Sequence, residues 1–380
     1  GLPYDIVVEK IRFDEPEQKP QSQNLADTLR SRLEKAKDSA GYAALKEDID
    51  TLFMDKNGDS LVGIASDEWL KQLADMPDDE FRKCADSYQK GTLNAYKLLP
   101  LSADRHNYRI TDDTLGVGGA KEKFRNNMSA IRLLHDLQIE NRLATPEEQE
   151  TLAKYVGWGG LSMAFDEKNA AWANEYKELK AELSDEEYRA AMESTLTAFY
   201  TPPVVIKAMY EALDRLGFSQ GNILEPSCGT GNFLGLLPDS MEKSKLHGIE
   251  IDPLSGRIAK QLYQKASIAI EGFEETKLPD NHFDVVLGNI PFGEFKVNDS
   301  RYNAQKFLIH DYFIAKALDK VRSGGVVMFI TSKGTMDKAS PEVRKYIAQR
   351  AELLGAVRLP DNTFRANAGT EVTSDILILQ

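Results

Sequence analysis

The stretch Ile223–Phe233 constrains the fold of this chain more than any other part of the sequence. A short apolar segment ends at Glu225 and runs into a turn that contains Gly229 and Gly231. Because glycine has no Cβ and permits positive φ, such a turn after a strand lets the backbone approach a nucleotide-like ligand closely. The stretch therefore predicts a ligand-binding turn between a strand and a helix of an α/β fold.

A second strand carries an acidic residue at a spacing that suits a ribose. The mostly apolar segment Leu246–Ile251 contains Glu250, about twenty residues after the glycine turn. A carboxylate at this place would accept hydrogen bonds from both ribose hydroxyls. The sequence thus predicts a ligand that contains adenosine with a free ribose.

Strands and helices alternate from residue 222 onward. The expected strands cover 222–225, 245–251, 267–271, 283–288, 325–331, 353–359 and 373–379, and the expected helices cover 231–236, 253–266, 303–322 and 341–351. This alternation predicts an α/β, Rossmann-like doubly wound fold, with a mainly parallel sheet and helices on both faces, after a mainly helical N-terminal region. Ligands of such sheets bind outside the carboxyl ends of the strands, where all these motifs lie.

Four motifs occur in the order Phe199–Pro203, Glu225–Gly231, Glu250 and Asn289–Phe292. Together they resemble the adenine-N6 DNA methyltransferases in which the cofactor-tail motif comes first. They resemble more closely the methylase module of large phage and conjugative-element proteins in which a helicase follows. The combination is far more specific than any single motif. The resemblance implies S-adenosylmethionine as cofactor, DNA as substrate, and a helicase-like domain in the same full-length chain.

The resemblance also implies which residues contact the cofactor and which act on the target. The implied cofactor-binding residues are Tyr200, Thr201, Glu225, Ser227, Gly229, Gly231, Asn232, Glu250 and Phe273, and the implied catalytic residues are Asn289, Ile290, Pro291 and Phe292. Thr201 precedes two prolines that start a helix running to about residue 216, and the N-terminus of that helix can hold the methionine carboxylate. A simple threonine cap before prolines is the alternative for this segment.

The Asn289–Phe292 cluster has the chemistry that adenine-N6 transfer needs. An exocyclic adenine amine is a poor nucleophile because its lone pair is delocalised into the ring. The side-chain oxygen of Asn289 and the carbonyl of Ile290 can accept the two amine hydrogens and localise that lone pair. Pro291 restricts the residue before it, and Phe292 offers a face on which an extruded base can stack.

Two positions depart from the family pattern. Ile290 stands where proline is usual, which removes some rigidity but keeps the carbonyl. Gly272 stands where relatives commonly carry an acidic residue for the cofactor's adenine, so Glu271 or Glu274 is the candidate substitute. Phe273 packs either on that adenine or in the core. Phe364 is a further candidate for the target-base pocket, with ordinary core packing as its alternative.

Composition sets the limits on partners and compartment. The net charge of −13 argues against a protein that coats DNA through clustered Lys and Arg, although DNA can still be a substrate. Cys84 and Cys228 are too few for a disulfide framework or a zinc site. The sequence has no apolar run of membrane-spanning length and no secretory signal pattern, so we expect a cytoplasmic protein.

Three regions are expected along the 380 residues. Residues 1–110 form a mainly helical region of unknown role, 111–197 a helical linker or lid, and 198–380 the methyltransferase core. Asp55–Ser60 resembles the start of a calcium-binding EF-hand loop, but Ser60 and Ser66 occupy the positions that need glycine and glutamate, which favours a polar turn. Because the apolar run 376–379 reads as the middle of a strand, we expect a fragment of a longer protein.

Region 111–197 has its own local signals. A glycine-rich linker at 116–120 precedes an amphipathic helix over about 121–137, and Thr145, Pro146 and Glu148 predict a capping box at the start of another helix. The segment Tyr155–Leu161 either lines the cleft or forms a tight turn around a packed indole. Residues 165–197 predict a solvated helical hairpin or lid.

Two other functions remain open from the sequence. The Asn-x-Pro-aromatic chemistry also suits a glutamine side-chain amide in a protein. A domain that binds S-adenosylmethionine without turnover, as an accessory or antirestriction module of a DNA translocase, is the non-enzymatic alternative. Cofactor binding without methyl transfer would identify it.

Overall fold

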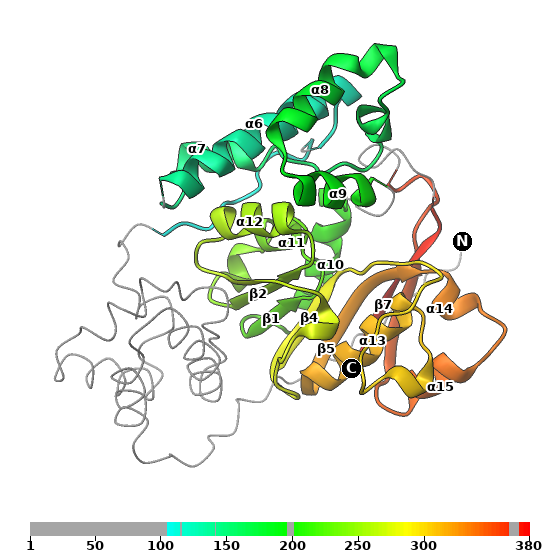
Figure 1. Cartoon of the computed structure of the whole chain (residues 1–380). Helices are drawn as coiled ribbons and strands as arrows, with labels where there is room; N and C mark the ends of the chain where they lie inside the picture. The colour runs from blue at the N-terminus through cyan, green and yellow to red at the C-terminus, as the bar shows by residue number, and fades with distance from the viewer. Residues whose placement is uncertain (1–104, 115, 141, 196–200, 365–371) are drawn as a thin grey trace, which may run out of the picture.

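The computed structural model describes residues 105–114, 116–140, 142–195, 201–364 and 372–380 (Figure 1). Its centre is a seven-stranded sheet with the strand order β3-β2-β1-β4-β5-β7-β6. The strands are β1 (Asn222–Glu225), β2 (Lys245–Glu250), β3 (Ser267–Ile270), β4 (Phe283–Asn289), β5 (Val321–Ser332), β6 (Leu353–Arg358) and β7 (Ser374–Leu379). The neighbours from β3 to β5 pair in parallel, and β7 runs antiparallel to both β5 and β6. The predicted α/β fold with a mainly parallel sheet is therefore confirmed.

Helices cover both faces of the sheet, as predicted. On one face lie α10 (Pro203–Arg215) and α12 (Pro253–Leu262), and on the other lie α13 (Ile309–Lys320) and α15 (Glu342–Ala348). The residues of β5 alternate between the two cores, with Val326 and Met328 on the first face and Val327 on the second. This alternation follows from the period of two in a strand. The short helices α11 (Asn232–Gly235) and α14 (Gly334–Asp337) follow strand ends.

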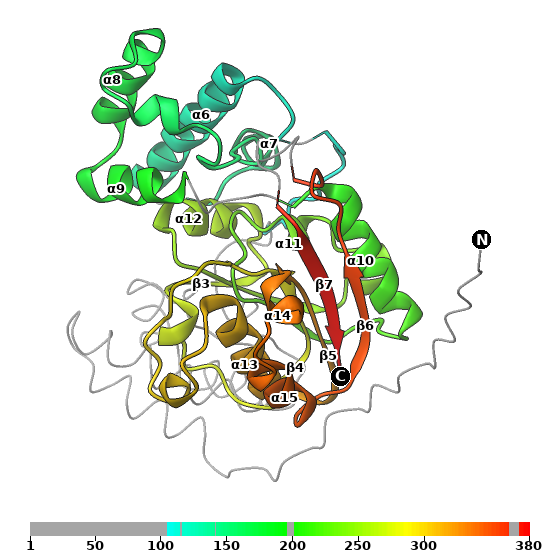
Figure 2. The same ribbon diagram turned by 90° about the vertical axis from the view of Figure 1, so that its right-hand side faces the viewer.

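Four further helices precede the sheet and lie over α12 (Figures 1 and 2). They are α6 (Ala120–Ile139), α7 (Pro146–Leu152), α8 (Ala173–Glu182) and α9 (Asp185–Ser194). The predicted capping box is confirmed, because the Thr145 hydroxyl accepts from the Glu148 N–H and the Glu148 carboxylate accepts from the Thr145 N–H. The charged hairpin of α8 and α9 contacts α6 through ion pairs such as Arg132 with Glu178.

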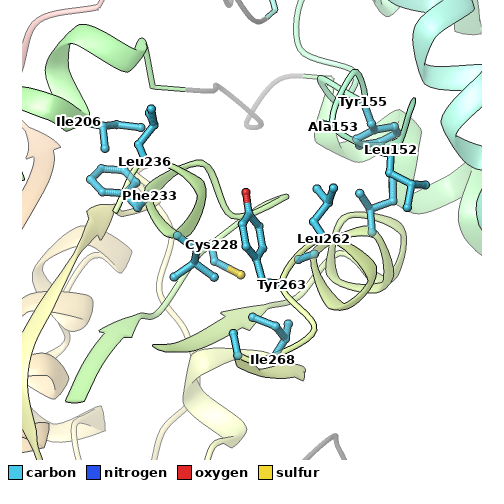
Figure 3. Packing of buried hydrophobic residues seen from close by; sticks show 14 of the residues in the cluster. Leu152, Ala153, Tyr155, Ile206, Cys228, Phe233, Leu236, Leu262, Tyr263 and Ile268 are labelled. Atoms are coloured by element: carbon cyan, nitrogen blue, oxygen red, sulfur yellow. The ribbon is translucent and has the colours of Figure 1, made fainter. Parts of the chain in front are cut away.

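These four helices share one hydrophobic core with the α10 and α12 face of the sheet. Figure 3 shows Leu152 facing Leu262, with Tyr263 on the other side of Leu262. The Gln149 side chain donates to the carbonyl of Leu262 at 3.0 Å, which adds a buried polar contact to the apolar packing. The helices before the sheet therefore pack as an extension of the core.

Three predicted boundaries were wrong by four residues or more, and one of them is the end of the helix expected over 253–266, which ends at Leu262. The helix expected over 303–322 begins only at Ile309, because Lys306 adopts φ 56° and ends a short 3₁₀ turn at Asn303–Gln305. The strand expected at 325 begins at Val321, and its register with β4 shifts between Phe283 and Val285. Helix propensity and apolar runs do not reveal a left-handed residue or a bulge of this kind.

Several expectations fall on residues outside the described ranges. These are the helices and the EF-hand-like turn of residues 1–104, and Tyr200. In the described ranges, no group of three or more His, Cys, Asp or Glu side chains is arranged to hold a metal ion. None of the helices in these ranges combines the length and the apolar character that crossing a membrane requires.

Candidate active site

A cavity of about 590 Å³ lies at the carboxyl ends of β1, β2 and β4. It brings together motifs that are up to ninety residues apart in the sequence. The predicted site residues that line it are Thr201, Glu225, Ser227, Gly229, Asn232, Glu250, Phe273, Asn289, Ile290, Pro291 and Phe292. This position, at the point where the strand order reverses, is where α/β sheets bind ligands.

Gly231 does not line the cavity, but it belongs to the turn that does. The turn after β1 places Gly229 at φ 56° and Gly231 at φ 89°, both in the left-handed region. A Cβ on Gly231 would lie 2.3 Å from Cε2 of Tyr263, whose buried ring packs beside Cys228 (Figure 3). Gly231 therefore lets the turn fold tightly against Tyr263, and contact with a ligand is not needed to explain it.

Glu250 fastens the glycine turn to the end of β2. One carboxylate oxygen accepts from the N–H of Gly229 at 2.6 Å, and the other accepts from the N–H of Asp252 at 2.8 Å. Burial raises the pKa of Glu250 to about 7. Each carboxylate oxygen has a second lone pair, so both keep acceptor capacity toward the cavity.

Glu225 is a second carboxyl group in the same wall. Burial, with the nearby Glu250 carboxylate, raises the pKa of Glu225 well above its usual range. Among the described residues, no hydrogen-bond partner contacts its Oε2 atom. A buried polar atom without a partner is uncommon and points to a group that binds in the cavity.

The Asn289–Phe292 segment begins at the last residue of β4. The Ser227 hydroxyl donates to the carbonyl of Asn289 at 3.0 Å, which ties the ends of β1 and β4 together. The N–H of Ile290 donates to the carbonyl of Ile330 at 3.1 Å, and the Ile290 side chain is buried in the core. The Ile290 side chain thus anchors the segment in the place of the usual proline.

Phe273 belongs to the cavity wall and to the core at once. Its side chain is 2% exposed and packs on Phe313 with ring centroids 5.0 Å apart. Glu271 and Glu274 on either side of it also line the cavity. Burial raises the pKa of Glu271. Both carboxylates therefore lie where the substitute for the missing acidic residue was expected.

Phe364, the candidate for the target-base pocket, is also both a wall and a core residue. It lines the cavity, and its side chain is buried in the core cluster. Phe364 and the Asn289–Phe292 segment therefore line one cavity, and Phe364 also packs in the core.

The helical region contributes walls that the methyltransferase motifs do not include. Tyr155 and Gly157 line the cavity, while the Trp158 side chain is buried and packs on Phe165 with ring centroids 5.3 Å apart. Both interpretations of this segment therefore hold in part. The buried Asn127 of α6 fixes it, donating to the Gly157 carbonyl at 2.5 Å and accepting from the Val156 N–H at 2.9 Å. No spacing in the sequence connects Asn127 with this segment.

Several other charged side chains in the sheet region have structural partners. Asp284 accepts from the Asn222 N–H and from Arg322, and Asp252 caps α12 through the Ser255 N–H. Arg301 forms ion pairs with Asp280 and Asp319, so it is committed within the fold. Lys296, in contrast, lines the cavity and is exposed.

The residues present fit an S-adenosylmethionine molecule. The cavity offers a carboxylate that suits a ribose in Glu250, a glycine turn with left-handed backbone, and the buried Thr201, which lies just before α10. The helix dipole is positive at this end of α10 and favours a carboxylate, while Pro202 and Pro203 have no N–H to donate. The residue types and the fold therefore agree with this cofactor.

Comparisons with known proteins support the same conclusion. The family model described as N-6 DNA Methylase matches residues 186–380, just over half of the chain. The chain is 30% identical over 259 residues to defense against restriction protein B of Escherichia phage P1, covering 67% of this chain and 10% of that protein. It is 36% identical over 94 residues to the type II methyltransferase M.CvrRI of Paramecium bursaria Chlorella virus XZ-6E, covering 25% of this chain and 24% of that protein.

The chain thus spans only a tenth and a quarter of the lengths of these two relatives. The family match covers the sheet and its motifs, and it begins within α9. S-adenosylmethionine is the cofactor that this fold and family use. On the family match and the architecture together, the chain belongs to the N-6 DNA Methylase family and has the fold of S-adenosylmethionine-dependent methyltransferases.

Proposed function

We propose that this chain methylates the exocyclic N6 amine of adenine in DNA. One observation carries the proposal: the Asn289–Phe292 segment lines the same cavity as Glu250 and the glycine turn. A methyl donor held by the turn and an amine held by the segment would therefore meet within one enclosed site. Proximity of this kind supplies much of the rate enhancement in group transfer.

The cofactor half of the site consists of groups that bind and orient. Glu250 would accept from the ribose hydroxyls, Phe273 would pack on the adenine, and the N-terminus of α10 near Thr201 would receive the methionine carboxylate. The buried Glu225 would face the positive end of the cofactor. When bound, S-adenosylmethionine supplies an electrophilic methyl group, whose bond to sulfur breaks as the bond to nitrogen forms.

The target half prepares the amine. The Asn289 side-chain oxygen and the Ile290 carbonyl would accept hydrogen bonds from the two amine hydrogens, so that the lone pair is localised and can attack the methyl group. One of these hydrogens then leaves the methylated amine as a proton to solvent. The hydroxyl of Ser227 holds the Asn289 backbone in place during this step. Phe292, with Phe364 on another wall, stacks on a base that has been flipped out of the duplex, because the amine of a paired base is buried.

DNA and further domains are the partners in this proposal. The net charge of −13 leaves little non-specific attraction to phosphates, so recognition elements beyond this chain would supply most of the affinity. We propose that the module acts within a larger mobile-element protein that also carries a helicase-like domain. The phage P1 relative, of which this chain matches only 10%, supports that context.

The test is the N6-methyladenine content of DNA incubated with the purified chain and S-adenosylmethionine. The native chain should produce methyladenine, and Asn289→Ala should lower the rate about 10²–10³-fold, the cost typical of removing one preorganised hydrogen-bonding group. Asn298→Ala is the matched control, because Asn298 is exposed and does not line the cavity. Equal rates in the native chain and Asn289→Ala would refute the proposed role of Asn289.

A second function is favoured by the phage P1 relative, whose name describes defence against restriction. In that case the module would bind S-adenosylmethionine and not turn it over. Calorimetry that finds cofactor binding, together with DNA and glutamine-containing peptides that stay unmethylated, would support this alternative. Methylation of the peptide alone would indicate an amide methyltransferase.

A further inference from the structure

Two loops that wall the cavity rest on the same helix, α13. The loop after β4 carries Asn289–Phe292 and continues through Phe295, Lys296 and Val297, all of which line the cavity. The loop after β3 carries Phe273. Under the proposed function, the first loop holds the target base and the second holds the cofactor's adenine.

Lys316 of α13 contacts both loops with a single ammonium group. Its side chain is 4% exposed. Nζ donates to the carbonyl of Phe273 at 2.6 Å and to that of Glu274 at 3.3 Å, and it lies 3.1 Å from the Asp299 carboxylate in the loop after β4. These three contacts use all three N–H groups of the ammonium. The same Nζ lies 5.0 Å from the centre of the Phe273 ring.

Asp299 is itself an anchor of the loop after β4. Its carboxylate accepts from the hydroxyl of Tyr312 at 2.8 Å and from the N–H of Arg301 at 3.1 Å. Its backbone carbonyl accepts from the N–H groups of Tyr302 and Asn303. A movement of this loop therefore acts directly on Asp299 and through it on Lys316.

Lys320, one turn further along α13, provides an internal comparison. It is also buried, and it donates to the carbonyl of Leu278 at 2.5 Å and to Asp280 at 2.8 Å. Neither of these two acceptors lines the cavity. Lys316 and Lys320 are thus chemically alike, but only Lys316 holds a residue of the cavity wall.

We propose that Lys316 is a positioning residue that couples the cofactor's adenine pocket to the target-base loop. Lys316 fixes the Phe273 carbonyl, and with it the Phe273 ring that would pack on the adenine, only while Asp299 keeps its contact with the Lys316 ammonium. Because a buried ammonium must keep its acceptors, displacement of one loop disturbs the other. Coupling of this kind is reciprocal, so DNA binding and cofactor binding should strengthen each other through Lys316.

The experiment compares Lys316→Met with Lys320→Met in the full chain. Calorimetry measures the Kd for S-adenosylmethionine with and without a DNA duplex, and steady-state assays separate KM from kcat. We expect Lys316→Met to raise the cofactor Kd about tenfold and to remove the effect of DNA on it, within the usual range of coupling factors. Lys320→Met should lower the thermal midpoint comparably and leave the cofactor Kd within about twofold of native.

A more conservative variant tests the same contact in case Lys316→Met does not fold. Asp299→Asn keeps the shape of the side chain, does not touch the cavity wall, and should still raise the cofactor Kd. A native cofactor Kd in Lys316→Met and Asp299→Asn, or equal effects of Lys316→Met and Lys320→Met, would overturn the proposal. The inference rests on the proposed function, but the two fail separately: absence of N6-methyladenine with the native chain refutes the function, while the cofactor Kd still reports on Lys316.

Discussion

The affinity for S-adenosylmethionine should fall as the pH is lowered from 8 to 6, because Glu250 loses its charge in this interval. Burial raises its pKa to about 7 in the folded chain without cofactor. The ionised carboxylate is the form that accepts hydrogen bonds from ribose hydroxyls, while a protonated carboxyl has lost part of that capacity. The binding-competent form is therefore present above about pH 7 and is lost below it.

The size of the effect follows from the fraction ionised. With a pKa of about 7, roughly nine-tenths of Glu250 is ionised at pH 8 and roughly one-tenth at pH 6. If the cofactor binds only the ionised form, its Kd at pH 6 should be about ten times that at pH 8. Glu250→Gln removes a charged acceptor and should cost about 1.5–3 kcal/mol of cofactor binding at pH 8.

Calorimetric titrations of both chains at pH 6, 7 and 8 test this reasoning. The α-amino group of the cofactor also titrates near pH 8, so the informative quantity is the slope in the native chain minus the slope in Glu250→Gln. The variant keeps the amino-group contribution and lacks that of Glu250. Equal slopes in the two chains would refute the assignment of Glu250 to the ribose.

Two stability predictions concern residues that support the cavity walls without lining the cavity. Gly231→Ala should lower the free energy of unfolding by about 2–5 kcal/mol, from about 1–2 kcal/mol for a left-handed alanine and about 1–3 kcal/mol for overlap with Tyr263. In the same urea titration Gly119→Ala should cost only about 0.5–1 kcal/mol, because an added Cβ meets no atom within 4 Å and only the preference for glycine at the N-cap of α6 opposes alanine. A tolerated Gly231→Ala would contradict the geometry of the turn. Asn127→Ala should cost about 2–5 kcal/mol, because two buried backbone groups lose their partners, and it should raise the cofactor Kd as Tyr155 moves. A lower free energy of unfolding without any change in the cofactor Kd would show that the Tyr155–Gly157 wall does not contact the cofactor.

Local patterns in the sequence were sufficient for the sheet and for most of its helices. Apolar runs of four to seven residues between turn signals predicted strands such as β1 and β4. Strands that are buried on both faces of a sheet have nearly continuous apolar sequences, so these runs could be recognised without any alternation of polar and apolar residues. The capping box at Thr145 and the prolines before α10 predicted helix starts, because these signals act within one turn. Boundaries failed where a single residue such as Lys306 adopts a left-handed conformation.

For the candidate site too, part of the arrangement could be predicted from local sequence and part could not. Strand ends in a parallel sheet meet at one edge, so the motif order alone placed Glu225, Glu250 and Asn289 together, and the structure has all three in one cavity. Their roles in binding and catalysis remain predictions. The sequence also predicted Gly231 as a cofactor residue; the structure shows it packed closely against Tyr263 and outside the cavity lining, and its contact with the cofactor stays a prediction.

The sequence by itself determined the sheet, the order of the motifs and the chemistry that each motif offers, because these depend on residues close together in the chain. Only the tertiary structure decided which distant side chains complete the cavity. Asn127 fixes the Tyr155–Gly157 wall from a helix thirty residues away, and Lys316 joins two loops from a third element. Such contacts leave no periodic signal, because a buried polar side chain finds its partners only after the helices have packed.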